Sequence, residues 1–418
     1  MRAGHLVHSI PPSAMEGDWR GYFTAEGRIY FSSGALQQSS WERPTLKTIN
    51  DAPEDCTPAK LVKVGNEVVA FYCLESGEVV DVKRFSVTTG EAVEDGPCLF
   101  PRSVGGEEGV RATFRDACAL EHDGKVLLAC AVNCLDVANN ISSDKLFISH
   151  LDEATVQQHQ LAPYRGPLLA SLEGMLYIGS QQGVVEVFDV MNQGMEAPVK
   201  RLCMGENLAA GMGSSLLAAG DFLSLSGIGV SCISTHGNTV LTGDINGTIR
   251  FIEKQRLCFP PLGIDCGKKY QGEISGMGVI TDYLFVAKKD SVFVFRWSQM
   301  HTLMDNCLGR VPPKPVCQFS LGSDLASEIT SLVCTDYGVF TGQKDGTVAA
   351  WSLPTKDQED YEYEYEDGEE EELPGPTERF LALNEGRTRL PPAGSCVWVC
   401  GKDESIKVLL GLSPSATT

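Results

Sequence analysis

The sequence predicts an all-β protein, in which a small three-stranded module precedes a β-propeller with seven blades. Three observations lead to this fold class. A strand–turn–strand template returns through most of the 418 residues, and a short aromatic-rich segment of different character precedes it. The 43 glycines favour many tight turns over long helices.

The repeated template ends one apolar strand at a small residue, passes through polar turn residues, and begins a second, alternating strand. It reads GSQQGVVEVFDV, GDINGTIRFIEK, GQKDGTVAAWSL and CGKDESIKVLLG, with weaker copies in VAKKDSVFVFRW and CLESGEVVDVKR. Asn-Gly and Asp-Gly turns between alternating runs are strong hairpin signals. An apolar strand precedes each copy, and a fourth, outer strand fits in the variable stretch that follows.

Four-stranded units at this spacing predict blades that pack radially into a ring. We place the blades at residues 58–95, 110–155, 163–195, 226–256, 271–300, 326–355 and 378–414, the second being the least regular. Residues 206–227 fit either a long outer strand or the remnant of another blade, so six or eight blades stay open. A β-sandwich or two smaller β domains is the alternative fold. The template resembles the WD-repeat family in degenerate form, with Phe188-Asp189 nearest to that family's Trp-Asp ending.

The N-terminal segment GDWRGYFTAEGRIYFSSGALQQSSWERP divides into three short strands, near residues 19–23, 28–32 and 38–42. A sheet this small needs an aromatic clasp to be stable. The two tryptophans, the Gly-Arg turn, the adjacent aromatic pair and the final proline closely resemble the WW domain. The alternative is a hairpin of the first blade. The predicted division is a tail at 1–14, a WW domain at 15–46, a linker at 47–57 and the propeller at 58–415.

Alternation along a strand places the neighbours Tyr30 and Phe31 on opposite faces of this sheet. The resemblance implies a core clasp on one face, made by Trp19, Phe31 and Pro44. On the other face it implies that Tyr30 and Trp41 hold a proline of a ligand in polyproline II form, while Ser39 donates a hydrogen bond to the ligand backbone.

Two departures from the WW pattern narrow the expected ligand. Gly34 and Ser32 stand where many members carry a histidine and its hydrophobic partner, which argues against a PPxY ligand. The first turn, residues 24–26, has no arginine to meet a phosphoserine. The expected ligand is therefore a plain proline-rich peptide, and a purely structural module is the alternative.

The net charge of −21 argues against nucleic acid or an anionic membrane as the main partner. Residues 357–372 contribute eleven acidic side chains, in an insert at 356–377 that we expect to be a disordered loop. This loop is either a solubilising insertion or a docking element for a basic partner. It also contains three candidate phosphorylation sites, Tyr361, Tyr363 and Tyr365.

No run approaches the roughly 18 apolar residues that span a bilayer, and no secretory signal is visible, so we expect an intracellular protein of the cytoplasm or nucleus. The fifteen cysteines are then expected as reduced thiols. The pairs Cys130/Cys134 and Cys396/Cys400 lie in strand-like text, where a spacing of four residues is too wide to share one metal ion. No metal and no cofactor are expected.

We find no HExxH, no Gly-x-Ser-x-Gly and no phosphate-binding loop, and we assign no catalytic residue. The sequence therefore predicts a non-enzymatic adaptor, whose module binds proline-rich proteins and whose propeller binds other proteins, with weak contacts adding through effective concentration. Analogy between domain types points to RNA-processing or ubiquitin-ligase assemblies. A propeller enzyme with a site facing the central channel is the alternative.

Overall fold

The computed structural model describes the strands and much of the chain between them, and nearly all described residues are extended. It covers residues 6–8, 19–23, 29–33, 38–40, 45–93, 110–203, 229–300, 315–320, 328–351, 396–400 and 406–410, apart from short gaps within the longer ranges.

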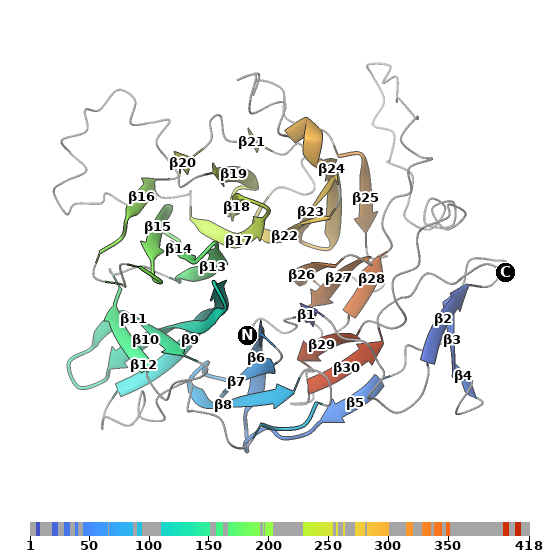
Figure 1. Cartoon of the computed structure of the whole chain (residues 1–418), viewed down its shortest axis with the longest axis horizontal. Helices are drawn as coiled ribbons and strands as arrows, with labels where there is room; N and C mark the ends of the chain where they lie inside the picture. Colours follow the sequence, from blue (N-terminus) through green and yellow to red (C-terminus); the bar gives the residue numbers. More distant parts are fainter. Residues whose placement is uncertain are drawn as a thin grey trace.

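Within these residues, seven antiparallel sheets form the blades of a ring (Figure 1). Blade 1 contains β6 (Thr57–Val64), β7 (Glu67–Cys73) and β8 (Val79–Ser86). Blade 2 contains β9 (Val110–His122), β10 (Lys125–Asp136), β11 (Ile141–His150) and β12 (Val156–Gln160). Blade 3 contains β13 (Leu168–Leu172), β14 (Met175–Gly179), β15 (Val184–Asp189) and β16 (Lys200–Cys203).

Blades 4 to 7 repeat the same order of strands. Blade 4 contains β17 (Val230–His236), β18 (Thr239–Asp244), β19 (Thr248–Glu253), β20 (Arg256–Leu257) and β21 (Leu262–Gly263). Blade 5 contains β22 (Ile274–Ile280), β23 (Tyr283–Lys288), β24 (Ser291–Arg296) and β25 (Cys317–Ser320), and blade 6 contains β26 (Ile329–Thr335), β27 (Gly338–Gln343) and β28 (Val348–Trp351). Blade 7 contains β1 (Leu6–His8), β29 (Cys396–Cys400), β30 (Ile406–Leu410) and β5 (Thr45–Ile49).

This arrangement confirms the predicted all-β propeller. In blades 2 to 6 each predicted interval contains the first three strands of one sheet, and the first strand of each blade is innermost (Figure 1). The outer strands β12, β16 and β25 lie beyond the ends of their predicted intervals. Blade 2, expected to be the least regular, has the longest strands in the described part of the chain, at 13, 12 and 10 residues for β9, β10 and β11. Residues 206–227 and the acidic insert at 356–377 lie outside the described residues.

The ring is closed by two strands from the N-terminal region. β1 pairs with β29 as the innermost strand of blade 7, and β5 pairs with β30 as its outermost strand. The assignment of residues 1–14 to a tail and 47–57 to a linker was therefore wrong for these stretches. The physical reason is that β1 and β5 are short and pair with strands more than 350 residues away in the chain, which leaves no local turn or hairpin signal.

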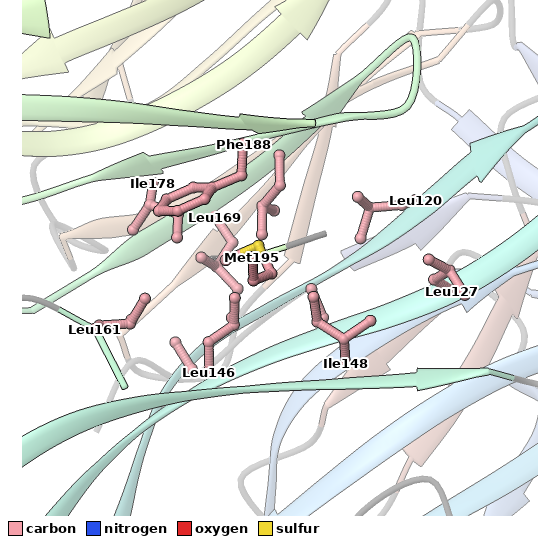
Figure 2. Packing of buried hydrophobic residues seen from close by; sticks show 12 residues of the cluster. Leu120, Leu127, Leu146, Ile148, Leu161, Leu169, Ile178, Phe188 and Met195 are labelled. Atoms are coloured by element: carbon pink, nitrogen blue, oxygen red, sulfur yellow. The ribbon is translucent and has the colours of Figure 1, made fainter. Parts of the chain in front are cut away.

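The hydrophobic core is divided into clusters that lie between successive blades. Figure 2 shows the cluster between blades 2 and 3, in which Leu120, Leu146 and Ile148 of blade 2 face Ile178 and Phe188 of blade 3. Similar clusters join blades 1 and 2, 3 and 4, 4 and 5, and 5 and 6. Each fully buried large apolar side chain contributes about 1.5–3 kcal/mol, so the ring is held mainly by contacts between sheets.

Backbone hydrogen bonds reinforce these interfaces on one face of the ring. The turn between the second and third strands of a blade offers a carbonyl to the innermost strand of the next blade. Phe114 N donates to Gly77 O at 2.9 Å, and Val230 N donates to Ser180 O at 2.9 Å. We call this side of the ring the hairpin face.

Candidate interaction surfaces

The N-terminal module is a three-stranded antiparallel sheet of β2 (Trp19–Phe23), β3 (Ile29–Ser33) and β4 (Gln38–Ser40), drawn outside the ring in Figure 1. The three strands lie where the sequence predicts them. The chain enters this sheet after β1 and leaves it before β5, so the module is inserted between two strands of blade 7.

The register of the module sorts the predicted site residues between its faces. Residues directly opposite one another on paired strands share a face. Tyr30 belongs with Ser32 by alternation, and Ser32 pairs with Ser39, so Tyr30 and Ser39 take positions on one face. Phe31 pairs with Gly21, which shares its face with Trp19. Trp41 and Pro44, the remaining predicted residues, lie outside the described residues.

The innermost strands of the propeller carry a polar network near the channel. Asp116 on β9 is buried, and its carboxylate forms an ion pair with Lys60 on β6. The other carboxylate oxygen accepts a hydrogen bond from Leu169 N on β13 at 2.8 Å. The innermost strands of blades 1, 2 and 3 are thus tied together by one side chain, and both charged groups are occupied by each other rather than offered to a ligand.

A repeated β-bulge in the innermost strands is a feature that the sequence analysis missed. It occurs in blades 1, 2, 4, 5 and 6. In blades 4 to 6 the extra residue carries a hydroxyl that donates to a carbonyl of the second strand: Ser231 to Gly243 O, Ser275 to Ala287 O and Thr330 to Gly342 O, at 3.2, 3.3 and 3.2 Å. The recurring pair of a β-branched residue followed by Ser or Thr could have indicated it.

The hairpin turn of blade 4 is fixed by a buried ion pair. Asp244 Oδ2 accepts from Arg250 Nη1 at 2.7 Å. Asp244 Oδ1 accepts from the backbone N–H groups of Asn246 and Thr248 at 2.9 and 2.8 Å. Because the carboxylate is fully used in holding this turn, the pair is structural.

The cysteines whose side chains the structure describes form no disulfide, and most of them are buried. Burial raises the pKa of Cys73 to about 12, and it raises the pKa of Cys118, Cys130 and Cys334 as well. A thiol with a raised pKa is a poor nucleophile, because the thiolate is the reactive form. Cys130 and Cys134 are buried among the apolar residues of β10.

Among the described residues, no group of three or more His, Cys, Asp or Glu side chains is placed to hold a metal ion. In the same part of the chain, no helix has the length and apolar character needed to cross a membrane.

Comparison with known proteins gives structural neighbours only. No family model matches the chain, and no curated protein is similar to it in sequence. Among solved structures, Raptor from Chaetomium thermophilum has a TM-score of 0.51 at 11% identity, over 88% of this chain and 29% of that one. Sqt1 from the same organism has a TM-score of 0.48 at 10% identity, over 88% of this chain and 100% of that one. A chain of a mitotic checkpoint complex has a TM-score of 0.45 at 13% identity, over 89% of this chain and 100% of that one. At these identities, the similarity to Raptor supports the fold alone.

Proposed function

We propose that this protein is a non-enzymatic adaptor, in which a WW-like module binds proline-rich peptides and a WD-repeat-like propeller binds other proteins. The observation that carries the proposal is the register of the module. Tyr30 and Ser39 take positions on one face, as a proline groove requires. Trp19 and Phe31 take positions on the other face, as the core clasp requires.

The way the module is attached favours an adaptor. Its strands are tied at both ends to blade 7 through β1 and β5, so a peptide bound to it is held close to the propeller. A second contact on the propeller is then intramolecular, and its effective concentration raises the overall affinity. Trp41 would complete the groove with Tyr30, and Pro44 would complete the clasp.

The cellular setting follows from chemistry and from analogy. The cysteines whose side chains the structure describes form no disulfide, which fits the reducing cytoplasm or nucleus. Partners in RNA-processing or ubiquitin-ligase assemblies rest on analogy between domain types alone. The acidic insert would add a contact for a basic partner.

The experiment uses the full-length chain with a fluorescent decaproline peptide and a matched peptide in which every second proline is alanine. Fluorescence anisotropy measures both affinities for the wild type and for Tyr30→Ala/Trp41→Ala. We expect the wild type to prefer decaproline and the double variant to bind about tenfold more weakly or worse. Tyr30→Phe, which keeps the ring, is the matched control and should retain binding.

A wild type that binds neither peptide would refute the peptide-binding half of the proposal. The module would then be a structural part of blade 7, provided that tryptophan fluorescence and limited proteolysis show it to be folded.

A further inference from the structure

Large apolar side chains that are strongly exposed gather on the hairpin face of the described propeller. They are Val80, Val137, Ile141 and Ile245, with exposed fractions of 46, 51, 62 and 41%. Each lies in or beside the turn that joins the second and third strands of its blade. A single exposed apolar residue is ordinary, but three of these four come from the adjacent blades 1 and 2.

Backbone pairing brings the turns of blades 1 and 2 together. Glu78, which follows the turn of blade 1, forms a β-bridge with Thr113 on β9. From Thr113, β9 and its partner β10 continue for three residues, to the pair Val110–Asp136, which is about 10 Å at 3.3 Å per residue. The β10–β11 hairpin therefore extends past the turn of blade 1, and Val137 and Ile141 lie at its tip.

Val80 is exposed for a structural reason. The pairing of β7 with β8 shifts between Tyr72 and Cys73, so Val80 is the extra residue of a bulge. A bulge takes a residue out of the ladder and makes further strand addition at that edge unfavourable. A partner at this edge is therefore recognised by side chains rather than by an added strand. We call the surface of Val80, Val137 and Ile141 the blade 1–2 rim.

The tip of the rim is braced by hydrogen bonds to one carboxylate. The Asp136 carboxylate accepts hydrogen bonds from the backbone N–H groups of Ala138 and Asn139 at 3.0 and 3.1 Å, and from Asn139 Nδ2 at 2.7 Å. These hydrogen bonds lower the pKa of Asp136, and the bond from the Asn139 side chain has the largest effect. The Asp136 carboxylate is therefore ionised at neutral pH. A preorganised surface loses little conformational entropy on binding.

The charges around the rim are mostly negative. Within residues 74–82, 110–113 and 133–144, the acidic side chains that are not buried are those of Glu75, Glu78, Asp81 and Asp136. The basic side chain of the same segments is that of Arg111. Directly after residue 82, Lys83 and Arg84 form ion pairs with Asp51 and Glu67. The negative charge around the rim repels acidic segments, including residues 357–372 of this chain, and attracts basic segments.

We propose that the blade 1–2 rim binds an extended segment of another protein in which apolar residues alternate with lysine or arginine. The apolar side chains of the segment would pack on Val80, Val137 and Ile141, and its cations would face Glu78, Asp81 and Asp136. This inference rests on one part of the proposed adaptor function, namely that the propeller binds another protein. It does not depend on the WW-like module.

The test uses the full-length chain and a fluorescent octapeptide of sequence Lys-Val-Lys-Ser-Lys-Val-Lys-Ser. Two matched peptides carry glutamate in place of lysine, or serine in place of valine. We expect the basic, apolar peptide to bind more tightly than both, and to weaken as salt rises from about 50 to about 500 mM because screening shortens the reach of the charges.

Variants then locate the binding site. Val137→Ser/Ile141→Ser should weaken binding about tenfold, and Glu78→Gln should reduce its salt dependence. Ile245→Ser makes the same kind of change on blade 4 of the same face and should leave the affinity unchanged. Tyr30→Ala should also leave it unchanged, which separates this site from the module.

Three results would overturn the inference. The first is equal binding of the lysine and glutamate peptides, and the second is an unchanged affinity in Val137→Ser/Ile141→Ser. The third is self-association of the wild type that this variant abolishes, measured by analytical ultracentrifugation, because the rim would then be covered by a second copy of the chain.

Discussion

The Asp116 carboxylate accepts a hydrogen bond from the backbone N–H of Leu169 at 2.8 Å, and so joins the innermost strands of blades 2 and 3. The same carboxylate pairs with Lys60 of blade 1. One side chain thus spans contacts separated by 53 and 56 residues in the chain. Stability near the channel therefore depends on a polar contact as well as on the apolar clusters between blades.

Asp116→Ala should lower the free energy of unfolding by about 3 kcal/mol, because it leaves Lys60 and the N–H of Leu169 without their acceptor in a largely buried place. Asp116→Asn should cost less, since its amide oxygen still accepts from Leu169. Urea unfolding followed by tryptophan fluorescence measures both. As a control, Lys344→Ala breaks the exposed Lys344–Glu328 pair and should change stability by at most about 0.5 kcal/mol. Additive effects of Asp116→Ala and Lys60→Ala would show that the pair is not coupled.

Gly278 on β22 lies against β26 of the next blade so closely that a side chain does not fit. A Cβ at Gly278 would lie 2.5 Å from Cys334 Sγ. Gly278→Ala should therefore cost about 1–3 kcal/mol through overpacking, measured by urea unfolding. Cys334→Ala, which removes the sulfur, should recover part of this loss. It should not rescue Gly276→Ala, whose Cβ would meet Leu332 N at 3.0 Å. Equal rescue of both variants would contradict this packing.

Deleting residues 1–8 should lower the midpoint of thermal unfolding by a few degrees, since it removes β1 and leaves the inner edge of β29 unpaired. Deleting residues 1–5 keeps β1 and is the matched control. Differential scanning fluorimetry compares the two truncations. Identical midpoints would mean that β1 contributes nothing to ring closure.

Acidification should destabilise the protein in part through His159 on β12. Burial lowers the pKa of His159 below its ordinary value of about 6.5. A group whose pKa is lower in the folded state favours folding above its unfolded pKa, and this contribution is lost as pH falls through that value towards the folded pKa. His159→Gln should therefore lose less stability than the wild type between pH 7.5 and pH 5.5. Urea midpoints of the wild type and of His159→Gln are compared at the two pH values, so that the contributions of the other histidines, which both proteins share, cancel. If both proteins lose the same stability, His159 does not contribute to the pH dependence.

The hairpins of the propeller could be predicted because each depends on residues a few positions apart. In GDINGTIRF, the Asn246-Gly247 turn joins two apolar strands, and Gly247 has the positive φ of 86° that such a turn needs. The module strands could be predicted for the same reason. The bulges of blades 4 to 6 leave a weaker signal, because it appears only when the β-branched residue and the following Ser or Thr are compared between blades.

What the sequence by itself determined is the all-β character, the position of the repeated hairpin in six of the seven blades and the short N-terminal sheet, all of which rest on local turns and alternation. Only the tertiary structure decided that β1 and β5 complete blade 7 and that Asp116 ties three blades. The physical reason is distance along the chain. These contacts join residues that are about 50 to 400 positions apart, and no local pattern specifies which distant strand will supply the partner.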